Sequence, residues 1–285
     1  LINIIDQTQT AMGARLLRKW MAFPLKEIKQ IERRQNSLKE FLNDEFIFEF
    51  IKENLNHIID LDRVIAKIAT EKISPRALNQ LSSSLDILEK IKEKILNGDT
   101  KYLKKQFKDL PSCKSLMKTL QKTIHPEAPV LVSKGNVIAE GFSKKLDSLR
   151  NLRNNSQTEL DKMLKRESER TKIPSLKIAF NNVFGYYIEV RNTHKDKVPI
   201  EWVRKQTLVN AERYVTDELK KFEIEIFQAE DQILILEQQL FEELMFFLQN
   251  NLELLKKNAN AVARLDVFYC FAKIAIRNNY CCPSM

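Results

Sequence analysis

The chain has 285 residues, enough for one large domain or two smaller ones, and its 44% hydrophobic content is sufficient for a buried core. Only 5 glycines and 8 prolines leave little material for a many-turned α/β sheet, and 30% charged residues suit exposed helix faces. A net charge of +9 is compatible with a polyanionic partner and equally with an ordinary basic protein. The composition therefore favours a mainly α protein.

The cysteines and the apolar segments give expectations about the compartment. No cysteine has the paired C-x-x-C spacing, so we expect reduced thiols and neither a disulfide framework nor a zinc site; they are Cys113, Cys270, Cys281 and Cys282. No apolar run reaches transmembrane length and no charged-then-apolar leader opens the chain, so we expect a cytoplasmic protein without a membrane partner. Because the chain opens on Leu1 and stops abruptly after Tyr-Cys-Cys-Pro-Ser-Met, we expect a fragment of a longer protein.

Helical patterns fill the first third of the chain. Residues 6–25 predict a short helix that begins near Thr10 and ends before Pro24, because proline disfavours helix at the preceding residue. Its predicted core face comprises Leu16, Leu17, Trp20 and Met21. Further helices are expected at about 27–43, 45–56 and 58–70. Ser74 and Pro75 then begin a longer amphipathic helix that ends at Gly98. Its apolar stripe is Leu78, Leu81, Leu85, Leu88, Ile91 and Ile95.

Two further segments precede the long helices. Residues 101–122 carry seven lysines against one acid, and apolar residues interleave with them, which favours a solvated helix face over a DNA-binding patch. Residues 128–141 resemble a small hairpin with a turn around Gly135, and we expect this segment to be a connector.

Two long helices are predicted to flank a short strand-like island. The first runs from about 142 to 170, and its apolar seam is interrupted at Arg153 and Ser156. The second runs from about 216 to 256 with a cleaner seam. Between them, residues 176–190 and 203–214 have the β-branched and aromatic alternation of half-buried strands. The simplest arrangement is an antiparallel helix pair that holds a small antiparallel sheet at its tip.

The island carries a disproportionate share of the positive charge. Between Lys172 and Arg213 there are eight basic residues and four acids, a net charge of +4. Such a surface suits contacts with phosphate oxygens that do not read base sequence, although a solvated sheet of mixed charge gives the same count. Its aromatic residues could stack on bases, but a sheet this small needs them for its own core.

The residues needed for catalysis or metal binding do not form a recognisable pattern. No P-loop or G-x-G-x-x-G can be built from glycines at 13, 98, 135, 141 and 185. The three histidines, at 57, 125 and 194, lack a second ligand at metal-binding spacing. We therefore expect no catalytic residues, no metal site and no bound cofactor in this chain.

Several segments in chain order resemble the DNA mismatch repair MutS family. They include TQTAMGARLLRKW (8–20), SPRAL (74–78), ESERT (167–171), FNNVFGYYIEV (180–190), RKQTLVNAERY (204–214) and NNYCCP (278–283). The resemblance extends over essentially the whole chain, and the GYYIEV and NAERY segments are the most specific. It identifies the chain as similar to the lever and clamp portion of such a protein.

The resemblance implies a division of labour along the chain. Residues 1–165 and 219–285 correspond to the helical lever, and residues 166–218 correspond to a clamp that closes around duplex DNA. An ATPase domain that uses ATP and Mg²⁺ would follow the chain, and mismatch-reading and connector domains would precede it. The resemblance further implies a homodimer, a possible MutL-type partner and a bacterial, nucleoid-associated location. Two alternatives stay open, namely a paralogue that binds junction or recombination DNA and a coiled-coil scaffold for a protein partner.

Candidate DNA contacts follow from the position of residues in the matching segments and from the island's charge. They are Lys177, Asn181, Asn182, Arg191, Arg204, Lys205 and Asn210. Asn181 and Asn182 are expected near a hairpin tip. The chain departs from the family pattern at Val209, where lysine is common, so a phosphate contact expected there is lost or moves to Lys205 or Arg204. A second departure, at Cys282, has no function that we assign.

Overall fold

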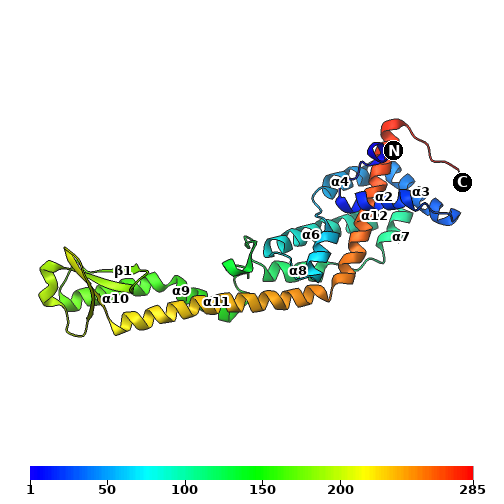
Figure 1. Ribbon diagram of the computed structural model, residues 1–285. Coiled ribbons are helices and arrows are strands. Elements are labelled where there is room, and N and C mark those ends of the chain that lie inside the picture. The colour runs from blue at the N-terminus through cyan, green and yellow to red at the C-terminus, as the bar shows by residue number, and fades with distance from the viewer. Residues whose placement is uncertain (285) are drawn as a thin grey trace. The chain divides into compact units, whose positions relative to one another are not determined.

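The computed structural model describes residues 1–284 and divides into two compact units. Unit 1 comprises residues 1–139 and 240–285, and unit 2 comprises residues 140–239. The expectation of a mainly α protein with a small antiparallel sheet is confirmed (Figure 1). No helix within the described residues is both long and apolar enough to span a membrane.

Unit 1 is built mainly from helices that pack around its last helix. The elements are α1 (Ile2–Ile5), α2 (Ala11–Ala22), α3 (Ile28–Asn43), α4 (Glu45–Leu55), α5 (Leu61–Ala69), α6 (Pro75–Asn97), α7 (Lys101–Phe107), α8 (Lys114–Thr123), the 3₁₀ turn η1 (Val132–Lys134) and α12 (Leu252–Asn278). Helix α12 packs against α2, α3 and α5, and Figure 1 shows α2 and α3 beside it. On α2, Leu17 is buried as expected, whereas Met21 is 36% exposed and lies outside the core.

The start of helix α2 is fixed by a buried carboxylate from α12. Asp266 accepts hydrogen bonds from the backbone N–H of Gln9 at 2.8 Å and of Thr10 at 2.7 Å, and from the Thr10 hydroxyl at 2.7 Å. Thr10 in turn caps α2 by accepting from the N–H of Gly13. A Cβ at Gly13 would lie 2.1 Å from Asp266 Oδ2, so the glycine permits the close approach of the two helices.

The predicted stripe of α6 and the lysine-rich segment both match the structure. All six apolar residues of the α6 stripe are buried, and the Ser74 side chain caps the helix by accepting from the N–H of Ala77. The lysine-rich segment forms α7 and α8. Leu103, Phe107 and Leu120 are buried there while the lysines stay at least partly exposed, an arrangement that both a solvated helix face and a DNA-binding patch require.

The hairpin predicted at residues 128–141 is wrong. Its first half contains η1, and Gly135 follows it with φ of 69°. Its second half pairs with the end of α8 instead, because His125 donates to Val137 O at 2.8 Å and Ala139 donates to Thr123 O at 2.8 Å. Val137 and Ile138 are fully buried. The free energy gained by burying Val137 and Ile138 in unit 1 outweighs that of the local hairpin pairing that the sequence pattern favours.

Both predicted long helices are interrupted at an asparagine pair. The first is divided into α9 (Lys144–Asn154) and α10 (Ser156–Thr171), and residues 151–155 are all exposed. The second, α11 (Asp217–Gln249), ends before Asn250 and Asn251, and α12 begins directly afterwards. The Asn251 side chain donates to Phe247 O at 2.8 Å. Asparagine side-chain amides hydrogen-bond to nearby backbone groups and so weaken the helical hydrogen bonding at these positions. The packing of the apolar seam does not offset this loss.

Unit 2 combines α9, α10 and most of α11 with a four-stranded sheet. The remaining elements are β1 (Lys177–Asn181), β2 (Gly185–Arg191), the 3₁₀ turn η2 (Asn192–Lys197), β3 (Val203–Thr207) and β4 (Ala211–Val215). One core joins the sheet to the helices; it contains Leu160, Ile173, Leu176, Ile188, Val190, Trp202, Tyr214, Leu219, Phe222 and Ile226. Between α9 and α11, the buried Arg150 forms an ion pair with Glu237, with Nη2 2.5 Å from Oε1.

Candidate nucleic-acid interface

The sheet of unit 2 has a helix-packed face and an opposite, polar face. Its strand order is β1-β2-β4-β3, and all neighbouring strands are antiparallel. Residues opposite one another share a face. Ile178, Ile188 and Tyr214 form one such row and pack on the core with α10 and α11. The adjacent row lies on the other face and consists of Lys177, Glu189, Arg213 and Gln206.

Arg213 holds the polar row together. Its Nη1 donates to Gln206 Oε1 at 2.8 Å, its Nε lies 3.4 Å from Glu189 Oε2, and its guanidinium lies 4.4 Å from the ring centroid of Tyr187. These partners occupy Arg213 within the sheet. Lys177 lies at the edge of the same row, opposite Glu189, and is exposed. Of the two cations in this row, Lys177 is therefore the one available to a ligand.

Asn181 and Asn182 lie at the hairpin that joins β1 to β2, where they were predicted. Asn181 Oδ1 accepts from the N–H of Val183 at 2.7 Å, which leaves its amide N–H groups for another partner, and Asn182 is exposed. Glu223 of α11 anchors the returning strand by accepting from the N–H of Tyr186 at 3.2 Å. Gly185 has φ of 74°, which favours glycine at this turn.

Arg191 and Asn210 meet at the opposite end of the sheet. The β3–β4 connection is a tight turn in which Leu208 donates to Ala211 O at 2.8 Å, and Val209 at its tip is 92% exposed. Asn210 is exposed beside it, and Arg191 is exposed opposite Ala211. Two hydrogen bonds from Asn192 fix the turn, because its N–H donates to the carbonyl of Asn210 and its side chain donates to that of Val209.

Arg204 and Lys205 have different surroundings although they are adjacent on β3. The register shifts between Arg204 and Gln206, so Lys205 lies in a β-bulge, where it is exposed. Arg204 instead lies 3.3 Å from Glu212, which also accepts a hydrogen bond from the Tyr214 hydroxyl. Burial and this carboxylate raise the pKa of Tyr214 to about 12. The Tyr214 hydrogen bond and the Arg204 charge lower the pKa of Glu212. Arg204 is thus partly committed to the sheet.

The structure separates the seven candidate residues into groups. We name the end of the sheet that carries the β3–β4 turn the turn end; it holds Lys177, Arg191, Lys205 and Asn210. Asn181 and Asn182 lie at the other end, about 13 Å from Lys177 along β1 and about 20 Å from Arg191 along β2. Arg204 lies between the two ends, but it is opposite Tyr214 and so belongs to the row that packs against the helices, not to the polar face. The groups at the two ends, without Arg204, are spaced so that they are able to follow a phosphate backbone along the sheet.

Sequence reasoning missed three residues that shape this surface. Asn192 holds the β3–β4 turn, and an asparagine directly after a strand is a usable signal for such a role. Lys195 of η2 is close enough for its charge to lower the pKa of Glu212, but the sequence showed it only as one of eight cations. Glu223 anchors the hairpin from α11, and no local pattern marks it.

No group of three or more His, Cys, Asp or Glu side chains suitable for a metal ion occurs among residues 1–284. The four cysteines are free thiols; Cys113 and Cys270 are buried, and burial raises the pKa of Cys113 to about 12 and that of Cys270 to about 11. The exposed lysine, arginine and asparagine side chains of the sheet offer hydrogen bonding and positive charge, which suit the binding of an anion.

Comparison with known proteins places the chain in a family. Residues 1–272 match the family model described as MutS domain III. The chain is 48% identical over 283 residues to the DNA mismatch repair protein MutS of Phocaeicola vulgatus, covering 99% of the chain and 32% of that protein. It is 47% identical over 285 residues to the DNA mismatch repair protein MutS of Christiangramia forsetii, covering 100% of the chain and 33% of that protein. The chain spans about a third of the length of the curated relatives that it matches. It belongs to the MutS domain III family.

Proposed function

We propose that this chain acts in DNA mismatch repair as a lever and a clamp, and that the clamp binds duplex DNA without reading its sequence. Residues 166–218 are the clamp, and residues 1–165 and 219–285 are the lever. The similarity to relatives named as DNA mismatch repair proteins supports a role of this chain in mismatch repair. The support for the clamp is the exposure of Lys177, Arg191 and Lys205 on one small sheet of net positive charge.

The sheet carries this proposal because its exposed groups suit a sugar–phosphate backbone. Lysine and arginine donate to phosphate oxygens, and the amides of Asn182 and Asn210 add uncharged donors at the two turns. Tyr187, Trp202 and Tyr214 are buried, so they are not available to stack on bases. Contacts of this kind position a protein on a duplex and provide little base discrimination.

The remaining parts of the proposal concern the longer protein. The parent is a DNA-dependent ATPase that binds ATP and Mg²⁺ in a separate domain, and the chain described here has no catalytic role. It works as a homodimer, with a MutL-type protein as a further partner, in the bacterial cytoplasm at the nucleoid. The coverage of about a third of each relative supports the presence of further domains.

The salt dependence of duplex binding tests the proposal. We expect the chain to bind two duplexes of unrelated sequence with similar affinity, measured by fluorescence anisotropy over a series of salt concentrations. Each phosphate contact contributes about 0.9 to the slope of log affinity against log salt, so the double variant Arg191→Ala and Lys205→Ala is expected to reduce the slope by up to about 1.8. Absolute affinity is expected to be modest, because a single clamp lacks the effective concentration that a second one supplies.

A matched control keeps the change of charge constant. Lys118 and Lys122 are exposed on α8 in unit 1, and changing both to alanine also removes two positive charges. The slope is expected to stay unchanged in that variant. Equal slopes for wild type and the Arg191 and Lys205 variant would rule out the sheet as the DNA contact. Affinity that does not fall with salt would favour the protein-scaffold alternative.

A further inference from the structure

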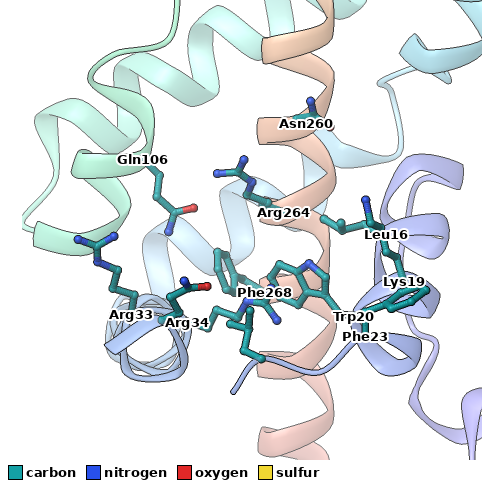
Figure 2. A pocket seen from close by; sticks show the side chains of 12 residues that line it. Leu16, Lys19, Trp20, Phe23, Arg33, Arg34, Gln106, Asn260, Arg264 and Phe268 are labelled. Carbon is teal, nitrogen blue, oxygen red and sulfur yellow. The ribbon is translucent and has the colours of Figure 1, made fainter. Parts of the chain in front are cut away.

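A second basic surface lies in unit 1, in a pocket of about 600 Å³ lined by residues of α2, α3, α7 and α12 (Figure 2). Four cations line it: Lys19 from α2, Arg33 and Arg34 from α3, and Arg264 from α12. No aspartate or glutamate is among the lining residues. The lining thus carries four positive charges and no negative charge, at a place that the proposed function does not use.

Aromatic packing holds one of the arginines in place. The rings of Trp20 and Phe268 make an edge contact with centroids 5.8 Å apart, and the guanidinium of Arg34 lies 3.5 Å from the centroid of Trp20. Stacking fixes the plane of Arg34 and leaves the edge of its N–H groups to donate. Figure 2 shows Gln106 and Arg264 extending into the same space. Because Arg34 covers one face of Trp20, that face is not available to stack on a ligand.

The cations of the pocket lack the partners that other arginines of unit 1 have. Arg15 binds Asp60 and Asp62 at 2.7 and 2.8 Å. Among the described residues, no carboxylate forms an ion pair with Arg33, Arg34 or Arg264.

Electrostatics point in the same direction. Burial, followed by the positive charge of Arg264, lowers the pKa of Arg34. Holding two guanidinium groups near each other in a partly enclosed space has an unfavourable energy, which a bound anion reverses.

We propose that this pocket binds a phosphate-containing anion that carries more than one negative charge. Guanidinium groups present planar pairs of donors that match the oxygens of a phosphate, and Lys19 and the amide of Asn260 add further donors. The volume lies in the range of small-molecule sites and exceeds what a single phosphate needs. The anion has two possible sources, a free polyphosphate or the backbone of a nucleic acid.

Calorimetric titration of the 285-residue chain tests the proposal, with inorganic tripolyphosphate in one arm and a short DNA duplex in the other. The pocket variant is Arg33→Gln with Arg264→Gln. Both side chains are exposed and neither is in an ion pair within the described residues, so the fold should be retained, which thermal unfolding without ligand checks. The control is Lys118→Gln with Lys122→Gln, which removes two charges from α8.

Tripolyphosphate is expected to bind at one site, about tenfold or more weakly to the pocket variant, because each charge-assisted hydrogen bond is a strong one. The control variant is expected to change affinity by less than about twofold. A pocket-dependent loss in the tripolyphosphate arm assigns the free anion as ligand, and a loss confined to the duplex arm assigns the backbone phosphate. Both results support the proposal, and the first is independent of whether the sheet of unit 2 binds DNA.

Three results would overturn the proposal. The first is an equal loss in the pocket and control variants, which indicates diffuse attraction to a basic surface. The second is the absence of pocket-dependent binding in both arms. The third is tighter pocket-dependent binding of hexaglutamate than of tripolyphosphate, which assigns the pocket to a protein carboxylate. Should the glutamine variant unfold, Arg33→Lys with Arg264→Lys keeps both charges and removes both planar donor pairs, and wild-type affinity in it would also overturn the proposal.

Discussion

The buried ion pair between α9 and α11 allows a prediction with a definite sign and size. Glu237 has no exposed surface and the Arg150 side chain is 10% exposed, and their nearest atoms are 2.5 Å apart. Removing one member of a buried pair leaves a charge in a medium that solvates it poorly, at a cost of about 3–5 kcal/mol. We therefore expect Arg150→Met to lower the free energy of unfolding of unit 2 by about this amount.

The two members of the pair are not equivalent. The Arg150 guanidinium also lies 3.8 Å from Asp147, whose side chain is 30% exposed. Glu237→Leu therefore leaves Arg150 near a second carboxylate and is expected to cost less than Arg150→Met. The double variant restores neutrality and is expected to come within about 1 kcal/mol of wild type, since an apolar pair replaces buried charges at little cost.

Urea denaturation measures these differences. Trp202 belongs to the core of unit 2, so its fluorescence in a Trp20→Phe background reports this unit alone. The matched control is Arg166→Met, which breaks the exposed ion pair of Arg166 with Glu218 on α10 and α11 and is expected to cost less than about 1 kcal/mol. The reasoning would be refuted if Arg150→Met cost no more than this control, or if the double variant were as unstable as Arg150→Met.

Three further predictions concern single residues. Gly13→Ala is expected to destabilise unit 1 by about 2–4 kcal/mol, because the new methyl overlaps Asp266; a rise in melting temperature from better helix propensity would contradict this. Gly185→Ala is expected to cost about 1–3 kcal/mol more than Gly141→Ala in denaturation. Both glycines have positive φ, but a Cβ added at Gly141 would have no neighbour within 4 Å, whereas one added at Gly185 would overlap the Glu223 carboxylate of α11. The pKa of Tyr214 is raised to about 12, so the folded state keeps a proton that the unfolded state loses. Its stabilising contribution is present below pH 10 and is lost as pH rises through 12, and spectrophotometric titration of wild type against Tyr214→Phe should locate this group.

Local patterns predicted the elements well where packing and pattern agree. The α6 stripe is an example, because its spacing, its Ser74 cap and its burial give the same answer. The breaks at Asn155 and Asn250 were missed because the apolar seam continues past them, although the asparagine pairs were visible in the sequence. The hairpin at Gly135 failed for a different reason. The competing partner of Ile138 is Ile124, which lies outside the segment where the pattern was sought.

In the candidate interface, too, local sequence patterns predicted some features and missed those that depend on tertiary packing. The sequence placed Asn181 and Asn182 at a hairpin tip, and the structure agrees. It did not distinguish Arg204, which is paired with Glu212, from its neighbour Lys205, which lies in a bulge. The arginine pocket of unit 1 joins residues of α3 and α12, more than two hundred residues apart, and no motif marks it. Tertiary packing decides such groupings, and periodicity does not report it.

Photocrosslinking at the turns of the sheet tests most directly whether this sheet is the DNA contact. Val209 is 92% exposed at the β3–β4 turn and Val183 is 78% exposed at the β1–β2 hairpin, so a benzophenone side chain at either position should not disturb packing. Val130, 52% exposed in unit 1, is the control position. We predict that positions 183 and 209 crosslink to duplexes of unrelated sequence, less efficiently as salt increases, and that position 130 does not. Crosslinking at position 130 with none at either turn would contradict the account.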